Sequence, residues 1–390
     1  MRPGRIIFLL FLFSNFLSAA QQKSIKFDKL SIENGLSQSS VTTVVQDDFG
    51  FIWIATQDGL NKYNGYEFEV FKNDPNNTAS IPNNYIHDLI PDTDGNLWFG
   101  TNRGIGKINP LTLEIEKVNR SNYPDLRGYV FVDLVFDQKG DLWALSDKHG
   151  INHINLKTKK IDVISSVSGN HEFSAIHIDE KQQLWIGTKT GQVFYSSPPY
   201  DYFAQIDYND IFSLSGINRF TEHKGQIIVS SENGIYRIGK SGKLSVISTH
   251  PFLRVSNINH AYVEDSLNTW IGTTDHGLIL LQKDEKGRQQ LFQYKKNPYD
   301  PSSISDDEIN TIYEDDNGDF VKLYGEVGVG GHIGSDYEYG EFYAEQNFID
   351  DSFATMGVKG KTDKMHYRLE LDYERENWKY GSGDMVLAID

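Results

Sequence analysis

Acidic, glycine-containing turns are the first segments of this sequence whose residue types could support chemistry. Runs such as Asp92-Thr93-Asp94-Gly95 and Asp315-Asp316-Asn317-Gly318-Asp319 supply oxygen ligands of the kind that calcium prefers. An EF-hand loop needs a glycine at its sixth position and a glutamate at its twelfth, and neither run has that spacing. Because Asp, Asn and Gly also suit tight hairpins, both runs are predicted to be turns.

Other patterns that would indicate catalysis or a metal are incomplete. His149 and His153 are four residues apart, but the glycine after His149 indicates a turn and a strand, and the Glu of His-Glu-x-x-His is missing. The glycine-rich stretch 325–334 does not fit G-x-G-x-x-G and precedes no helical pattern. No serine lies in Gly-x-Ser-x-Gly, and the chain has no cysteine. The sequence predicts no enzyme, no cofactor and no metal site.

Aromatic side chains beside polar residues are the remaining candidates for contact with a ligand. Aromatic rings stack on sugars, and neighbouring Asn, Asp and Arg side chains hydrogen-bond to hydroxyl groups. The candidates are Tyr63, Tyr66, Tyr123, Arg127, Tyr129, Tyr200 and Tyr202. The alternative is that most of these tyrosines pack between blades or cover loops.

The elements that would position these residues follow from the tryptophans. Trp53, Trp98, Trp143 and Trp185 are 45, 45 and 42 residues apart, and Trp270 follows after 85. A period of about 40–45 residues is typical of a four-stranded β-propeller blade. The interval before Trp270 covers two periods, and the skipped position falls at Ile228. The predicted structural anchors of the repeat are therefore Trp53, Trp98, Trp143, Trp185, Ile228 and Trp270.

Similar residues surround each anchor. The alternating segment Val41-Thr42-Thr43-Val44-Val45 predicts a strand, because successive side chains point to opposite faces. An Asp/Asn/Gly turn follows, the anchor lies in a second strand, and a later glycine precedes a third. A lone blade could not bury both of its faces, so the blades are predicted to stack around an axis.

These units closely resemble the two-component regulator propeller repeat, which is found in periplasmic sensor domains of hybrid histidine kinases. The resemblance rests on cores such as Asp94-Gly95-Asn96-Leu97-Trp98-Phe99-Gly100-Thr101 and on linkers such as Asn73-Asp74-Pro75. It covers about residues 25–318 and implies an all-β propeller of six recognisable blades plus an incomplete seventh. It also implies a ligand-sensing or interaction domain of a signal-transduction regulator, without the kinase part in this chain. Some relatives are thought to detect carbohydrate breakdown products, so a small-molecule or glycan ligand is expected.

The first twenty residues have the pattern of a secretory signal peptide. Arg2 and Arg5 precede an apolar segment, and Ser18-Ala19-Ala20 supplies a cleavage site. The alternative is an uncleaved anchor. Residues 1–20 are therefore assigned as signal peptide, residues 21–318 as propeller, and the location as periplasmic. The net charge of −17 argues against nucleic acid and anionic lipid surfaces as partners.

The repeat changes character in its seventh unit. By register a tryptophan should fall at Val321, but different text follows, including the alternating segment Met365-His366-Tyr367-Arg368-Leu369-Glu370. Residues 319–390 resemble the first strands of a Gram-negative outer-membrane porin, and any membrane contact or outer-membrane location would come from this tail. The alternatives are a porin fragment fused to a propeller, a chimeric or artefactual gene product, or a segment 320–329 that simply completes the seventh blade.

Overall fold

The computed structural model describes residues 25–165, 167, 172–207, 214–239, 242–248, 250–254, 256–284 and 286–314, together with the backbone of five later strands. The chain divides into two compact units, Met1–Gly331 and His332–Asp390. The predicted signal peptide, the predicted junction at 316–319 and Trp378 lie outside the described residues.

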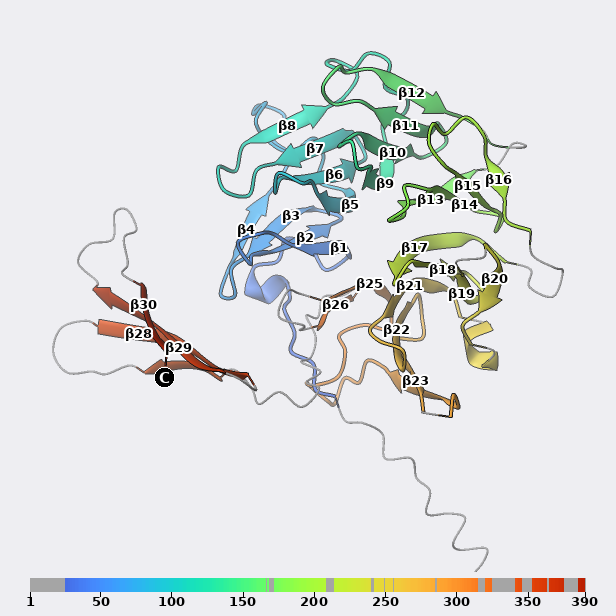
Figure 1. Ribbon diagram of the computed structural model, residues 1–390. Helices are drawn as coiled ribbons and strands as arrows, with labels where there is room; N and C mark the ends of the chain where they lie inside the picture. Colours follow the sequence, from blue (N-terminus) through green and yellow to red (C-terminus); the bar gives the residue numbers. More distant parts are fainter. Residues whose placement is uncertain are drawn as a thin grey trace, which may run out of the picture. The chain divides into compact units, whose positions relative to one another are not determined.

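Six four-stranded antiparallel sheets make up most of the first unit, and each has its strands in chain order (Figure 1). The first three sheets comprise β1 (Val41–Gln46), β2 (Ile52–Thr56), β3 (Gly59–Tyr63) and β4 (Phe68–Phe71); β5 (Ile86–Pro91), β6 (Leu97–Thr101), β7 (Gly104–Ile108) and β8 (Ile115–Val118); β9 (Phe131–Phe136), β10 (Leu142–Ser146), β11 (Gly150–Ile154) and β12 (Ile161–Ile164).

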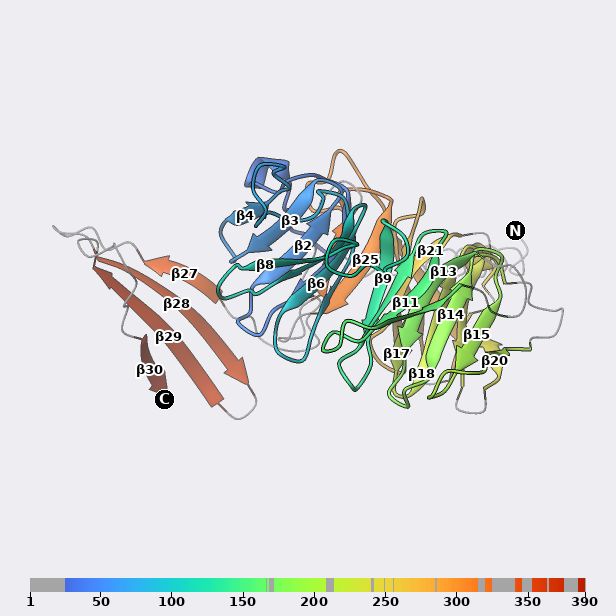
Figure 2. The same ribbon diagram turned by 90° about the horizontal axis from the view of Figure 1, so that it is seen from above.

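The other three sheets repeat this arrangement, and Figure 2 shows β13, β14 and β15 side by side. They comprise β13 (Phe173–Ile178), β14 (Leu184–Thr188), β15 (Val193–Ser196) and β16 (Ala204–Gln205); β17 (Ile217–His223), β18 (Gln226–Ser231), β19 (Gly234–Ile238) and β20 (Leu244–Val246); β21 (Ile258–Val263), β22 (Asn268–Thr273), β23 (Leu278–Lys283) and β24 (Gln289–Tyr294). Among the residues that the structure describes, the helical elements are two short 3-10 turns, η1 (Ile32–Asn34) and η2 (Pro251–Arg254). The described part of the first unit is therefore an all-β propeller with six four-stranded blades, as predicted.

A two-stranded sheet of β25 (Ile309–Glu314) and β26 (Phe320–Tyr324) lies between the sixth and first blades (Figure 1). Asn259 on β21 donates to the carbonyl of Ile309 at 3.1 Å, and Asn310 donates to the carbonyl of Val41 on β1 at 2.9 Å. β25 thus connects the last complete blade to the first. β26 contains residues that the sequence analysis assigned to the porin-like tail, and the structure pairs them with β25 instead.

The hydrophobic core consists of separate clusters, each formed by two neighbouring blades. Trp53 of the first blade packs with Phe99 of the second, and Trp143 of the third packs with Phe194 of the fourth. Ile228 fills the equivalent place between the fifth and sixth blades. All six anchors are at most 5% exposed. Large apolar side chains at this position join the blades because each buries area against the next sheet.

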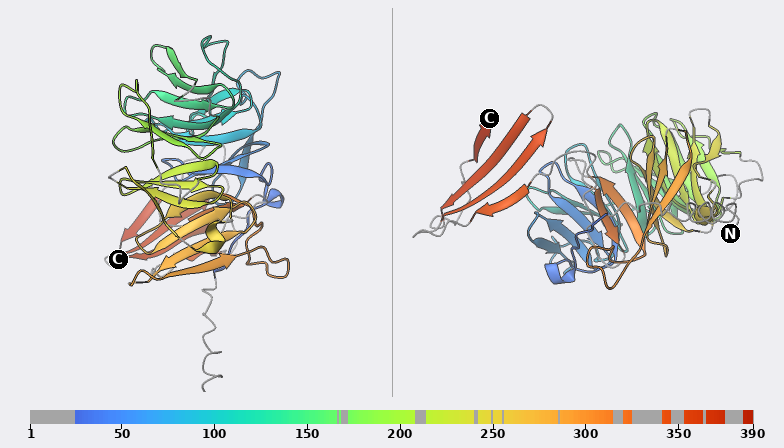
Figure 3. Two further views of the ribbon diagram at one scale, coloured as in Figure 1. Left: turned by 90° about the vertical axis from the view of Figure 1, so that its right-hand side faces the viewer. Right: turned by 90° about the horizontal axis from the view of Figure 1, so that it is seen from below.

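The second unit contains β27 (Glu341–Glu345), β28 (Phe353–Thr362), β29 (Met365–Glu374) and β30 (Met385–Ile389). Each strand pairs antiparallel with the next, so the four form one sheet, drawn in red in Figure 3. Within the described part of the whole chain, no helix has the length and apolar character needed to cross a membrane.

Candidate functional site

The first strand of each sheet lies nearest the propeller axis, and these strands share one irregularity (Figure 1). In β1, β5, β9, β13, β17, β21 and β25, the pairing with the next strand skips the second residue. The third residue therefore has an equivalent place in all of them. We call these third residues the channel ring; they are Thr43, Asp88, Asp133, Ala175, Arg219, His260 and Thr311.

The acidic members of the channel ring accept hydrogen bonds from backbone N–H groups of the next first strand. A first strand is an edge strand, so N–H groups on its inner side need partners other than a neighbouring strand. Asp88 Oδ2 accepts a hydrogen bond from the N–H of Leu134 at 2.9 Å, and Asp133 Oδ2 accepts one from the N–H of Ile176 at 2.7 Å. Each carboxylate thus bonds to the following strand of the ring.

His260 has the same role on β21. Its Nδ1 accepts a hydrogen bond from the N–H of Ile312 at 3.0 Å and lies 3.3 Å from the hydroxyl of Thr311. Burial, together with the positive charge of Arg219, lowers the pKa of His260 well below its usual value. A neutral imidazole has a free acceptor nitrogen, which this backbone amide requires.

The ring residues Asp88, Asp133 and Arg219 line a cavity of about 400 Å³. The cavity is formed by β5, β9, β13 and β17, and Ser174 and Asn218 add further polar groups to its wall. Asp88 is 7% exposed, whereas Asp133 and Arg219 are partly exposed. Charged groups of both signs therefore meet in one concave space.

The two carboxyl groups of the cavity titrate together. Burial raises the pKa of Asp88, although Arg219 opposes this rise. Burial and the charge of Asp88 raise the pKa of Asp133 to about 8. At neutral pH the pair therefore holds a proton, and it can both donate and accept hydrogen bonds.

The acidic turns of the repeat have a structural role. Their carboxylates accept a hydrogen bond from the indole N–H six residues later, in the pairs Asp47–Trp53 (2.7 Å), Asp92–Trp98 (2.8 Å), Asp137–Trp143 (3.3 Å), Asp179–Trp185 (3.0 Å) and Glu264–Trp270 (2.8 Å). Ile228 offers no such donor, and the acid six residues before it, Glu222, accepts from the N–H of Glu180 at 3.0 Å instead.

The predicted ligand residues lie on three separate parts of the propeller: the first blade (Tyr63, Tyr66), the loop between the second and third blades (Tyr123, Arg127, Tyr129) and the end of the fourth blade (Tyr200, Tyr202). Tyr66, Arg127, Tyr129 and Tyr202 are exposed, as a role in binding requires. Tyr63 is half-buried, and its hydroxyl donates to the carbonyl of Gly65 at 2.7 Å.

Two of the predicted tyrosines pack against the protein itself. Tyr123 is 7% exposed and belongs to the cluster between the second and third blades. Tyr200 is half-buried against Trp143, with 4.8 Å between ring centroids, and its hydroxyl donates to the carbonyl of Gln182 at 3.1 Å. Their burial matches the alternative that these side chains fill gaps in the interior.

Tyr129 lines a second hollow, of about 440 Å³, beside the loop that follows the second blade. The guanidinium of Arg120 lies 4.5 Å from its ring centroid and donates to its hydroxyl at 3.0 Å. Arg103 and Lys117 also line this hollow, so it gathers positive charge on a chain of negative net charge.

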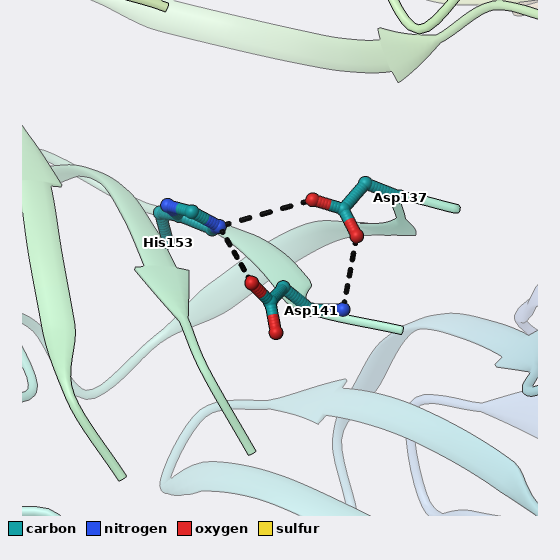
Figure 4. A group of neighbouring side chains, drawn as sticks. All are labelled: Asp137, Asp141 and His153. Atoms are coloured by element: carbon teal, nitrogen blue, oxygen red, sulfur yellow. Dashed lines mark hydrogen bonds and ion pairs between the residues drawn. The ribbon is translucent and has the colours of Figure 1, made fainter. Parts of the chain in front are cut away.

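A third group of residues could hold a metal ion. Among the described residues, Asp137, Asp141 and His153 place one ligand atom each within 4.8 Å of one another (Figure 4). The sequence analysis paired His153 with His149 instead. His149 is exposed, and its Nδ1 lies 2.9 Å from the carbonyl oxygen of Asp147.

The sequence analysis did not identify Asp88, Asp133 and Arg219. A usable signal was present, because each is the third residue of the first strand in its repeat. Aligning the blades by their anchors would have shown that this position holds charged residues in some blades and small or neutral ones in others. The alignment alone would not have shown that these charges share a cavity.

Two segments of the chain match a known family. Residues 35–58 and 80–103 match the family described as two component regulator propeller. These segments contain the β1–β2 hairpin of the first blade and the β5–β6 hairpin of the second, where the acid–indole pairs Asp47–Trp53 and Asp92–Trp98 lie. A stretch of 73 residues is 40% identical to histidine kinase P4 of Formosa agariphila, which covers 19% of this chain and 5% of that protein.

Solved structures with the same fold include the extracellular domain of a two component system and a lyase. The extracellular domain of BT4673 from B. thetaiotaomicron, described as a proposed hybrid two component system, aligns with a TM-score of 0.65 at 18% identity. The alignment covers 93% of this chain and 47% of that one, so this chain spans about half the length of that domain. A streptogramin B lyase aligns with a TM-score of 0.59 at 13% identity, over 78% of this chain and 96% of the lyase. At these identities the likeness establishes the fold only.

Proposed function

We propose that this chain carries the exported ligand-binding propeller of a two-component regulator and binds a small polar molecule in the cavity of the channel ring. The observation that carries this proposal is the cavity of about 400 Å³ lined by Asp88, Asp133 and Arg219. Small-molecule sites are concave spaces of roughly 300–1,000 Å³ with a few converging polar groups. The match of two segments to the two component regulator propeller supports the sensor role.

The lining of the cavity favours a ligand rich in hydroxyl groups. The guanidinium of Arg219 donates hydrogen bonds, and the protonated Asp88–Asp133 pair both donates and accepts them. Ser174 and Asn218 are neutral groups in the same wall. A mono- or disaccharide presents donors and acceptors of this kind, so we propose a carbohydrate as the ligand.

Binding is favoured over catalysis because the charged groups already hold the ring together. The carboxylates of Asp88 and Asp133 and the Nδ1 of His260 each accept a backbone N–H of the next strand. These hydrogen bonds give each of these groups a structural role in the ring, which explains its presence without a catalytic function. We therefore propose that the chain is not an enzyme.

The same proposal places the propeller in the periplasm, after export by the signal peptide. We also propose that β25 and β26 are the inner half of an incomplete seventh blade, because β25 makes ring contacts to both β21 and β1. For the sheet of β27–β30, we keep the proposal of a porin-like fragment that brings any outer-membrane contact. A chimeric gene product is the alternative origin for this arrangement.

A thermal-shift screen of the purified protein against a glycan panel tests the proposed function. A ligand of the cavity should raise the melting temperature, and the rise should disappear in Arg219→Met but persist in Tyr129→Ala. Binding in the hollow beside Arg120 would give the reverse pattern. If no glycan shifts the melting temperature, the carbohydrate class is wrong, and if Arg219→Met responds like the parent protein, the site is wrong.

A further inference from the structure

The hairpin of the third blade holds two carboxylates and an imidazole side by side. Asp137 and Asp141 lie at the two ends of the turn between β9 and β10, and His153 lies on β11 (Figure 4). His153 Nε2 is 3.4 Å from Asp141 Oδ2 and 3.9 Å from Asp137 Oδ2. Asp137 is 7% exposed and Asp141 is 8% exposed, so both carboxylates are largely removed from water.

The second blade has an amide at the place that Asp141 occupies in the third. There Asn96 takes the place of Asp141: its Oδ1 accepts from Asn109 at 3.1 Å, and its Nδ2 donates to the carboxylate of Asp92 at 3.0 Å. The second blade therefore places an amide donor, and not a second carboxylate, beside the carboxylate of the turn.

In the third blade this donor is missing. Asp141 Oδ1 accepts a hydrogen bond from Asn155 at 2.9 Å, as Asn96 Oδ1 does from Asn109. Where Asn96 has its amide nitrogen, however, Asp141 has a second oxygen, Oδ2. Two buried carboxylates therefore face one space without the amide N–H that the second blade places between Asn96 and Asp92. Like charges in a buried space are unfavourable unless a positive group compensates them.

The imidazole is held in place but lacks a hydrogen bond on its inner nitrogen. His153 pairs across the strands with Trp143, and the two rings stack at 4.0 Å with 13° between their planes. Its Nε2 atom is buried and has no hydrogen-bond partner among the described residues, although it lies beside both carboxylates. In the first two blades the equivalent residues are Lys62 and Lys107, which place a permanent positive charge over the indole.

We propose that Asp137, Asp141 and His153 form a binding site for a divalent transition-metal ion such as Zn²⁺. Metal–ligand bonds of about 2.0–2.2 Å at tetrahedral angles place ligand atoms roughly 3.3–3.6 Å apart. His153 Nε2 is already 3.4 and 3.9 Å from the two carboxylates, and all three ligand atoms lie within 4.8 Å of one another, so the group must close by about 1 Å or less around the ion. One imidazole with two carboxylates suits zinc-like ions better than calcium or magnesium, which prefer oxygen ligands alone.

The ion would join the β9–β10 turn to β11 and supply the charge that a lysine supplies in the first two blades. His153 must be neutral to bind the ion through Nε2, so binding releases any proton held there. The side chain of His153 is 24% exposed, so the three ligands lie close to the surface of the blade. This inference does not depend on the proposed ligand in the channel.

Zinc titration of the full chain, free of a histidine tag and previously treated with EDTA, tests the site. We expect one Zn²⁺ per chain by isothermal titration calorimetry and a higher melting temperature with Zn²⁺ than with EDTA. Because His153 stacks on Trp143, we also expect Zn²⁺ to change the tryptophan emission.

Two variants are matched to residues that this chain already uses. Asp141→Asn recreates the second blade's Asn96, and His153→Lys recreates its Lys107, so both should fold. Each should lower the zinc affinity at least about tenfold, which is the loss that even an outer-shell change produces. Asp94→Asn changes the net charge equally at an exposed position and should leave binding intact.

The opposite results would overturn the proposal. If the parent protein takes up no Zn²⁺ even at a large molar excess, the metal site is wrong, and His153 only packs on Trp143 beside the two carboxylates. Unchanged binding in both Asp141→Asn and His153→Lys would place the ion elsewhere. Tighter binding of Ca²⁺ than of Zn²⁺ would exclude an imidazole-ligated site.

Discussion

The hydrogen bond between Asp47 and Trp53 should couple the first hairpin to the blade interface. The indole N–H donates to Asp47 Oδ2 at 2.7 Å, while Asp47 Oδ1 accepts the N–H groups of Phe49 and Phe51 at 3.0 Å. Asp47 is 4% exposed and Trp53 is 0% exposed. One buried carboxylate therefore satisfies three donors, and no water can take the place of a lost partner.

Asp47→Asn tests this because an amide has only one acceptor oxygen. If that oxygen faces the turn, its NH₂ group opposes the indole N–H; if it faces the indole, the NH₂ group opposes the two backbone N–H groups. We expect a loss of about 1.5–3 kcal/mol, the range for a hydrogen bond to a charged group. Trp53→Phe should cost about 2–4 kcal/mol, through lost apolar area and a carboxylate oxygen without its donor.

The double variant measures the bond itself. We expect it to be less destabilised than the sum of the two single variants by about 1–3 kcal/mol, because each single change already removes the same interaction. Urea unfolding followed by circular dichroism gives the three free energies. Additivity within about 0.5 kcal/mol would refute the proposed coupling. The control is Glu222→Gln with Ile228→Val in the fifth blade, where no indole is present and the changes should add.

Three further predictions follow from the fold. Gly128→Ala should lower the melting temperature more than Gly65→Ala. Both glycines have a positive φ (94° and 93°), so the backbone strain is the same in the two variants. A Cβ on Gly128 would lie 2.7 Å from Ser146 Cβ, whereas one on Gly65 meets nothing within 4 Å. Asp133→Asn should gain stability relative to the parent as pH rises from 5 to 8. Burial raises the pKa of Asp133 in the folded protein to about 8, so between about pH 4 and 8 the carboxyl is ionised in the unfolded protein but protonated in the folded one. The parent therefore loses stability as the pH rises through this range, whereas the asparagine variant does not. An unchanged difference in melting temperature between the two proteins would contradict this. Asn310→Asp should lower the free energy of unfolding in urea more than Asn310→Ala does. The alanine variant loses only the 2.9 Å hydrogen bond to the carbonyl of Val41 on β1, worth about 1 kcal/mol, whereas the aspartate variant also turns a carboxylate oxygen toward that carbonyl. Equal losses in the two variants would contradict the contact.

The blade architecture was predictable because it depends on local spacing. A large apolar side chain is needed once per blade to fill the gap to the next sheet, so the repeat length appears directly as the distance between Trp53, Trp98 and Trp143. The same register located Ile228, which the structure places in the equivalent cluster between the fifth and sixth blades. The hairpin turns followed from the residues that tight turns require.

The candidate sites were less predictable because their residues are distant in the chain. Asp88 and Arg219 are far apart in sequence and share a cavity only because β5 and β17 both lie at its wall. The seven ligand candidates, six tyrosines and Arg127, were chosen by residue type and neighbours, and residue type does not distinguish the exposed Tyr202 from the buried Tyr123. Exposure depends on which sheet packs over a loop, and short-range patterns do not contain that information.

By itself, the sequence determined the repeat, the blade register and the position at Val321 where the tryptophan pattern stops. These properties need only the alternation of strands, the chemistry of turns and one large side chain per blade. Tertiary structure alone decided that β25 and β26 connect the sixth blade to the first, that Asp88, Asp133 and Arg219 share a cavity, and that His153 meets Asp137 and Asp141. The physical reason is that each of these contacts joins side chains from different strands, and only the pairing of strands and the closing of the ring set the distances between them.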